Sequence, residues 1–343
     1  MMTRNLQSKI RDPNAGAAGD DFFGFRIWNR FMISLVSCFL LAPFVTFGEE
    51  TEHPFRFGFS TALMPEVNEN DCRAAMKAWA ETIVKNGVVK ADPNVVLLDN
   101  LADMITAARN RAVDGLVATT TDYFRIQEQV RFNRCIFGVK DGSISDEYLL
   151  LVQQNSDLNK VEDLRGRSLN VLRQSQMCLA TIWLDTLLLE QGLKPSLDFC
   201  GSVTDEAKLT TTVLPVFFHK ADACLVTRKG FKTMCELNPQ LSQQLRVLAS
   251  SPKFVAAGFF FRAGYPAVPQ NEYLTEFTRV QDSPAGQQIL TVFQTERLEE
   301  HPAAVLDSAF ALLERHRQLL GGTNSIGTHP TNAAQDEIQG AVK

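Results

Sequence analysis

The sequence predicts an α/β protein built from two similar lobes, each a doubly wound parallel sheet with helices on both faces. The first observation is the order of elements, because residues 55–120 and residues 168–227 each alternate strand, helix, strand, helix and strand. The second is a repeated phrase: DGLVATT begins at Asp114 and DACLVT at Asp222, 108 residues later (222 − 114). Connections of this kind are right-handed, so we expect two parallel sheets.

In the first half, residues 55–60 (FRFGFS) alternate apolar and polar side chains and end at a Ser-Thr pair, which indicates a strand entering a turn. Apolar residues then recur at three- and four-residue steps between Cys72 and Ile83, as in an amphipathic helix. A buried strand is expected at 94–98, a second helix over 101–108, and the third strand at 114–120.

The second half repeats this order. Its expected elements are a strand at 168–172, a helix over 179–187 that ends near Gly192, a short strand at 199–203, a helix over 205–217 and the third strand at 222–227. Pro215 lies inside the second of these helices.

The remaining segments connect the two halves. Residues 148–152 and 245–261 are apolar enough for buried strands, and residues 274–320 are helical by pattern. We expect the chain to cross between the lobes near 141–147 and 251–258 as a hinge. The resulting division is lobe one at 54–146 and 254–320, lobe two at 147–253, and a loose polar tail at 321–343.

The N-terminal region, residues 1–48, has the layout of a secretory signal. Residues 31–47 carry no charge, two arginines stand just before them, and small residues follow near Gly48. We therefore expect the body to be periplasmic or otherwise extracytoplasmic. An uncleaved anchor, or lipid attachment at Cys38, remains an alternative, although the apolar run is slightly shorter than a bilayer span.

The composition excludes several classes of function. A formal charge of −5 over 343 residues, without a long basic block, argues against nucleic acid as a partner. The six cysteines beyond the signal form no CxxC motif or Cys/His cluster, so we expect free thiols and neither a metal nor a cofactor. Nucleophile-elbow, zinc-helix and P-loop motifs are absent from the sequence, and no histidine is placed beside the expected cleft, so we do not expect an enzyme.

The expected binding site lies beyond the carboxyl ends of the strands, where helix N-termini present free N–H groups to an anion. Hydroxyl side chains gather there, and Arg228 could add a bidentate contact. The candidate ligand-binding residues are Ser60, Thr61, Thr119, Thr120, Thr121, Tyr123, Ser175, Gln176, Thr204, Thr227 and Arg228. Each has a structural alternative, since Ser and Thr at strand ends commonly cap helices. Asp114 and Asp222 precede their strands, away from the cleft, and are interpreted as turn or cap residues.

The sequence resembles the periplasmic solute-binding proteins of ABC transporters with the type II two-lobe fold, within the phosphate, phosphite and phosphonate-binding group. The segments that carry the resemblance are FRFGFSTALMPEVNENDCRAAMKAWAE, ITAARNRAVDGLVATTTDY and YLLLVQQNSDLNKVEDLRGRSLNVL. The group often has a Ser-Thr-Ser run at the first helix of lobe two, where this chain has Gln174, Ser175, Gln176 and Met177. Of these four residues, only Ser175 has the hydroxyl side chain found in that Ser-Thr-Ser run.

The resemblance implies a monomer that binds a small oxyanion such as phosphonate, phosphite or phosphate and delivers it to a membrane permease. Two alternatives stay open at this point. One is an enzyme built on the same fold, and the other is a ligand-sensing ectodomain in which the bound solute signals.

Overall fold

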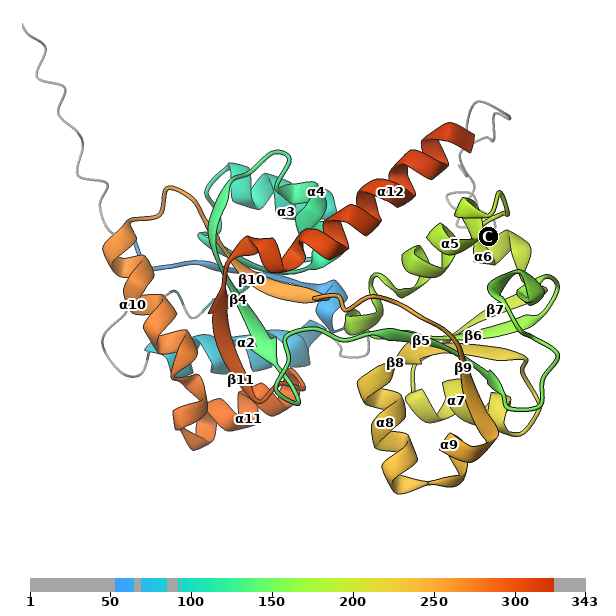
Figure 1. Ribbon diagram of the computed structural model, residues 1–343. Coiled ribbons are helices and arrows are strands. Elements are labelled where there is room, and N and C mark those ends of the chain that lie inside the picture. Colours follow the sequence, from blue (N-terminus) through green and yellow to red (C-terminus); the bar gives the residue numbers. More distant parts are fainter. Residues whose placement is uncertain (1–52, 65–68, 85–91, 93, 324–343) are drawn as a thin grey trace, which may run out of the picture. The chain divides into compact units, whose positions relative to one another are not determined.

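The computed structural model describes residues 53–64, 69–84, 92 and 94–323 (Figure 1). The expected signal, residues 1–48, lies outside the described residues. Two sheets are present, one on either side of the chain crossings, and the two-lobe α/β fold class predicted from the sequence is confirmed. Among the described residues, no helix is both long enough and apolar enough to cross a membrane.

The first sheet has six strands in the order β11-β4-β10-β3-β1-β2. Their bounds are β1 Phe57–Ser60, β2 Val96–Leu98, β3 Gly115–Thr119, β4 Phe132–Val139, β10 Ala257–Arg262 and β11 Arg297–His301. The first three are parallel, whereas β10 runs antiparallel between β3 and β4. The expected parallel core is therefore extended by antiparallel strands.

Helices cover both faces of this sheet (Figure 1). On one face lie α2 Glu69–Val84, α10 Ala267–Thr278 and α11 Pro284–Val292, packed on an aromatic core that includes Phe55, Phe57 and Phe259. On the other face lie α3 Leu101–Arg109 and α4 Thr120–Ile126, packed on a second core with Leu116 and Phe260. Strand side chains alternate between these two cores because successive residues point to opposite faces.

The second sheet has five strands in the order β7-β6-β8-β5-β9. Their bounds are β5 Tyr148–Gln153, β6 Ser168–Leu172, β7 Ser202–Glu206, β8 Ala223–Thr227 and β9 Leu245–Ser250. Figure 1 shows α5 Ala180–Glu190 and α6 Ser196–Phe199 on one face, and α7 Leu209–Phe217, α8 Arg228–Leu237 and α9 Gln240–Gln244 on the other. All five residues of β8 are buried, which explains its continuous apolar run.

Three details of the predicted elements were wrong. The expected strand at 199–203 is formed by residues 202–206, because the turn of helix α6 ends at Phe199 and buries that side chain. The helix expected from residue 205 consequently begins at Leu209. The C-terminal part expected to be all helical contains strand β11, which precedes helix α12 Asp307–Thr323.

The two repeated aspartates have the same structural role in both sheets. Asp114 accepts a hydrogen bond from the backbone N–H of Arg56, just before β1, at 3.1 Å. Asp222 accepts one from the backbone N–H of Ser168, the first residue of β6, at 2.8 Å. Each carboxylate thus joins the start of the third strand to the start of the first, at the end of the sheet opposite the strands' carboxyl termini.

The chain leaves the first sheet after β4, at residues 140–147, and returns before β10, at residues 251–256. These two crossings are hydrogen-bonded to each other, since Asp146 and Phe254 exchange backbone bonds of 3.0 and 2.8 Å. Helix α12 makes a further connection between the sheets, because it contacts both α4 and α5. Its Arg315 pairs with Glu190 of α5 at 2.9 Å.

Candidate functional site

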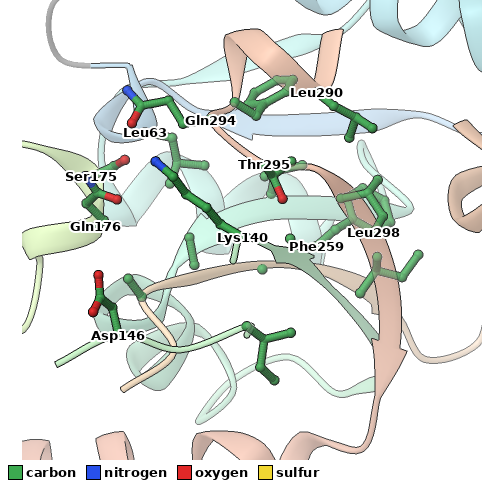
Figure 2. Close-up of a pocket in the computed structure, with 18 of the residues that line it drawn as sticks. Leu63, Lys140, Asp146, Ser175, Gln176, Phe259, Leu290, Gln294, Thr295 and Leu298 are labelled. Carbon is green, nitrogen blue, oxygen red and sulfur yellow. The ribbon is translucent and has the colours of Figure 1, made fainter. Parts of the chain in front are cut away.

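A cavity of about 280 Å³ lies beside the two chain crossings and is lined by residues associated with both sheets. Its walls come from the face of the first sheet that carries Phe59, Ile136 and Phe259, from helices α2, α10 and α11, and from the loop that follows β6. Figure 2 shows most of the labelled polar residues apart from most of the apolar ones, although Leu63 lies beside Lys140 and Thr295 lies between the two groups. Lys140, Asp146, Ser175 and Gln176 lie toward one side, and Leu290, Leu298 and Phe259 toward the other.

The Lys140 side chain is presented by a tight turn in the first crossing. Lys140 and Ser143 exchange backbone hydrogen bonds of 3.1 Å in both directions, which closes a two-residue turn over Asp141 and Gly142. Both central residues have positive φ, 50° and 70°. This is the geometry for which an Asp-Gly pair is favoured. The turn holds Lys140 and Ser143 side by side on the pocket wall.

Lys229, near the start of α8, braces this turn. Its ammonium donates to the carbonyl oxygen of Lys140 at 2.5 Å and to that of Ser143 at 3.1 Å. Burial lowers the pKa of Lys229 below its ordinary value, although the nearby carboxylates of Asp146 and Asp141 oppose this. The ammonium of Lys229 is therefore hydrogen-bonded to the backbone of the turn. That of Lys140 has no hydrogen-bonding or ion-pair partner among the described residues.

Asp146 is the one acidic residue among the described residues that line the pocket. One of its carboxylate oxygens accepts from the backbone N–H of Glu147 at 2.8 Å and, at 3.4 Å, from that of Lys229. Burial raises the pKa of Asp146, and the two backbone hydrogen bonds only partly offset this. Two lysines and one aspartate give the lining a formal charge of +1 (2 − 1).

The loop after β6 supplies Gln174, Ser175 and Gln176 to the pocket. The Tyr148 hydroxyl donates to the carbonyl oxygen of Gln176 at 2.9 Å and ties the loop to β5. The Cys178 thiol donates to the carbonyl oxygen of Ala256 at 3.2 Å and ties it to the returning crossing. These two anchors fix the loop against both crossings. The Gln176 side chain in turn donates to that of Gln174 at 2.7 Å.

Gln294 and Thr295 reach the pocket from the end of α11. Gln294 has a φ of 52°, a left-handed conformation that usually falls to glycine or asparagine at this position after a helix. Thr295 donates to the carbonyl oxygen of Val139 at 2.8 Å, which docks this corner onto β4. Figure 2 shows the Gln294 amide on the same side of the pocket as the Lys140 ammonium and the Ser175 side chain.

Of the residues expected from the sequence to bind a ligand, Ser175 and Gln176 line this pocket. The candidates after β1 and β3 lie beside it. Ser60 is fully buried and its hydroxyl has no hydrogen-bonding partner among the described residues, while Thr61 donates to Asp99 at 3.0 Å. Thr119 caps α4 by accepting from the backbone N–H of Asp122 at 3.1 Å.

Thr120, Thr121 and Tyr123 face different surroundings. The Thr120 hydroxyl donates to the carbonyl oxygen of Val255 at 2.6 Å, and that of Thr121 bonds with Thr119 at 2.8 Å. The Cys178 sulfur also interacts with Thr120 and Thr121. This contact brings the lobe-one hydroxyls to the same loop as Ser175. Tyr123, in contrast, is a core residue that stacks on Phe260 with ring centroids 3.6 Å apart.

The lobe-two candidates are also spread over several positions. Thr204 lies inside the edge strand β7, opposite Asn170, and is exposed. Thr227 caps α8 by accepting from the backbone N–H of Gly230 at 3.1 Å. The Arg228 guanidinium pairs with Glu147 at 2.6 Å, so the neighbouring Lys229, and not Arg228, lines the pocket.

The sequence reasoning missed Lys140, Asp146, Lys229 and Gln294. For Lys140 a signal existed, since Lys-Asp-Gly-Ser between two apolar runs is typical of a tight turn at a strand end. For Gln294 there was none, because its place depends on the pairing of β11 with β4. Within the described part of the chain, no group of three or more His, Cys, Asp or Glu residues is arranged to hold a metal ion.

Two α/β sheets joined by paired crossings, with a pocket lined from both, define the class of two-lobe solute-binding proteins. Residues 61–304 match the family model described as ABC transporter, phosphonate, periplasmic substrate-binding protein. The chain belongs to this family, and the resemblance drawn from its sequence is confirmed. The family is one of substrate-binding proteins and not of enzymes. No curated protein sequence matches the chain.

Solved structures share the fold at low sequence identity. A binding protein component of an ABC phosphonate transporter from Pseudomonas aeruginosa has a TM-score of 0.54 at 12% identity, covering 80% of this chain and 90% of that one. PhnD1 from Prochlorococcus marinus, in complex with methylphosphonate, has a TM-score of 0.53 at 14% identity over 78% and 98%. A Xanthomonas citri protein bound to ATP has a TM-score of 0.54 at 13% identity over 80% and 100%.

Proposed function

We propose that this protein binds a small phosphonate-type oxyanion in the pocket beside the crossings and delivers it to the membrane permease of an ABC transporter. The observation that carries the proposal is the Lys140 ammonium, which lines the pocket without a partner among the described residues. A cation in a partly desolvated site attracts an anion, and its hydrogen bonds to an oxyanion are stronger than those between neutral groups. Membership of the phosphonate family supports the choice of anion.

Three donors from three segments would hold the head of the ligand. Lys140 comes from the first crossing, Ser175 from the loop after β6, and Gln294 from the corner after α11. A tetrahedral oxyanion has several acceptor oxygens, so it can use an ammonium, a hydroxyl and an amide together. The Ser60 hydroxyl, which has no hydrogen-bonding partner among the described residues, is a further candidate. Thr119, Tyr123, Thr227 and Arg228 have structural roles, and Thr204 is an exposed edge-strand residue that does not line the pocket.

Closure of the lobes would follow from this division of contacts. Lys140 belongs to a crossing, Gln294 to the helices over the first sheet, and Ser175 to the second sheet. A ligand that contacts all three is bound more tightly when they are close together, so it shifts the population toward the closed form. The permease would then recognise the closed protein. The family's periplasmic location supports an extracytoplasmic site of action for this chain.

Isothermal titration calorimetry with methylphosphonate, phosphite and phosphate tests the proposal, with sulfate as a control oxyanion. We expect at least one phosphorus oxyanion to bind more tightly than sulfate. Lys140→Ala should weaken this binding about 10- to 100-fold, since a hydrogen bond to a charged group contributes about 1.5–3 kcal/mol. Ser175→Ala should weaken it as well. The matched control is Lys194→Ala, which removes an exposed lysine outside the pocket.

Absence of binding by every phosphorus oxyanion would reject the proposed function. Equal affinities of the Lys140→Ala variant and the unaltered protein would reject the assignment of the site. Circular dichroism of each variant establishes that it is folded before its affinity is interpreted.

A further inference from the structure

Much of the pocket lining is apolar. The floor and far wall include Met76, Phe277, Leu290 and Leu298, from α2, α10, α11 and β11. Met76 and Phe277 are fully buried, so they belong to the packed core of the first lobe that backs this wall of the pocket. Figure 2 shows Leu290, Leu298 and Phe259 gathered on the side away from Ser175, Gln176 and Asp146.

The pocket has a volume of about 280 Å³, which is more space than a small oxyanion head needs. Protein cores pack at the density of organic crystals, and a single water needs only about 10–15 Å³ of such space. Water gains little in a cavity walled by Phe, Met, Leu and Ile, because it finds few hydrogen-bonding partners there. An apolar group of a bound molecule would make dispersion contacts with these walls.

Small residues stand on the part of the pocket wall nearer the chain crossings. On the face of the first sheet that lines the pocket, Gly138 and Ala257 stand nearer the crossings, and Ile136 and Phe259 stand deeper. A side chain at position 138 could not be accommodated without movement, because its Cβ would lie 2.6 Å from the Thr295 hydroxyl. The space over Gly138 is thus taken by the Thr295 side chain, which comes close to the strand backbone.

We infer that the ligand is an amphipathic oxyanion: a phosphonate whose alkyl or aryl substituent extends from the Lys140 end into the apolar cavity against Leu290, Leu298 and Phe259. The inference rests on the proposed function, because it takes the anionic head to lie at Lys140 and Ser175. It adds that the substituent on phosphorus contributes to affinity through the area that it buries. Inorganic phosphate and phosphite, which have no such substituent, are accordingly weaker ligands than the cognate one.

The test is a calorimetric titration of the full chain with methyl-, propyl-, butyl-, hexyl- and phenylphosphonate, with 1-hexanol as a ligand that has a tail and no anionic head. We expect each added methylene group to tighten binding about fourfold, the equivalent of about 0.8 kcal/mol, until the cavity is full. Hexanol should bind far more weakly than hexylphosphonate, because it makes no charged contact with Lys140.

A variant that narrows the cavity tests whether the substituent binds at the apolar end. Leu298→Phe puts a larger side chain at the apolar end, and it should reduce the ratio of the hexyl- to the methylphosphonate affinity. Leu237→Phe is the matched control, since Leu237 is an exposed leucine of α8 that does not line the cavity, and it should preserve this ratio. If Leu298→Phe does not fold, Leu298→Ala is used instead. It enlarges the cavity and should move the plateau of affinity to a longer chain.

The outcomes separate this inference from the function on which it rests. If methylphosphonate binds and hexylphosphonate binds no more tightly, the apolar extension is wrong and the oxyanion site stands. If no phosphonate of any length binds, the proposed function fails and the inference fails with it. An unchanged hexyl-to-methyl ratio in the folded Leu298 variant would also overturn the placement of the substituent.

Discussion

Replacement of Asp114 by alanine should destabilise the protein much more than the same replacement at Asp222, although the two aspartates occupy equivalent places in the two sheets. The Asp114 side chain is 0% exposed, and it pairs with Arg262 at 2.9 Å and with Arg56 at 3.1 Å. The Arg262 side chain is itself only 10% exposed. Removal of the carboxylate would therefore leave a buried guanidinium without its ion-pair partner.

The size of each loss in stability follows from how deeply the ion pair is buried. Breaking a buried pair by removal of one partner costs about 3–5 kcal/mol, because the remaining charge stays desolvated. The Asp222 side chain is 36% exposed and lies 3.5 Å from the half-exposed Arg167, so solvent screens that pair. Removal of the Asp222 carboxylate mainly loses the two hydrogen bonds that it accepts from the Ser168 backbone N–H and hydroxyl, at 2.8 and 2.7 Å. We expect a cost of about 1–2 kcal/mol for Asp222→Ala.

Urea unfolding followed by circular dichroism measures both costs as differences in the free energy of unfolding. A loss of 3–5 kcal/mol corresponds to a melting temperature lower by roughly 6–20 °C in a domain of a few hundred residues. Asp114→Asn is an informative companion, since it keeps the shape of the side chain and removes its charge. Equal losses at the two positions, or a loss below about 1 kcal/mol for Asp114→Ala, would refute the reasoning from burial.

Three further predictions concern pH, thiol chemistry and backbone packing. Burial by itself would raise the pKa of Asp222, but the hydrogen bonds from Ser168 and the charge of Arg167 outweigh it and hold the pKa below its ordinary value. This carboxylate therefore stabilises the fold above the pKa of an unfolded aspartate, about 3.9, and its contribution is lost as the pH falls through the lower pKa of the folded state. The urea midpoint should consequently fall less steeply between pH 6 and 2.5 in the Asp222→Asn variant than in the unaltered protein. Burial raises the pKa of the Cys178 thiol to about 12, so iodoacetamide should label Cys178 far more slowly in the native protein than in urea. Peptide mass spectrometry measures the two labelling rates, and similar rates would contradict the burial of Cys178. A Cβ at Gly286 would lie 1.7 Å from the Val280 carbonyl oxygen, so Gly286→Ala should lower the melting temperature by several degrees, whereas Gly321→Ala, with nothing within 4 Å of the added atom, should not.

The sequence predicted the duplicated sheets because their evidence is local. The strand that begins at Gly115 and the one that begins at Ala223 are short apolar runs with an aspartate before them, and both are buried third strands in the structure. The interpretation of Asp114 as a turn or cap residue agrees with its bond to the start of β1. The antiparallel strand β4 was not predicted, because its apolar run gives no sign of which strands it pairs with.

The pocket lining was predicted only where it depends on a single strand. Ser175 lies in the loop after β6, and the rule that ligands bind beyond the carboxyl ends of strands led to this residue, which lines the pocket. Arg228 and Lys229 are neighbours in sequence, and the choice between them was decided by Glu147, which pairs with Arg228 at 2.6 Å. That ion pair joins residues 81 positions apart, so a pattern read along the chain cannot reveal it.

The sequence by itself determined the two-lobe α/β fold and the family, because strand and helix patterns, turn residues and motif order are all written within short stretches of chain. Only the tertiary structure decided which residues face the pocket. Lys140, Ser175 and Gln294 are far apart in sequence, and they line one cavity because β4, β6 and β11 occupy particular places in their sheets. The apolar depth of that cavity was likewise decided by packing, since the spaces left between side chains depend on how helices α2, α10 and α11 lie against the first sheet.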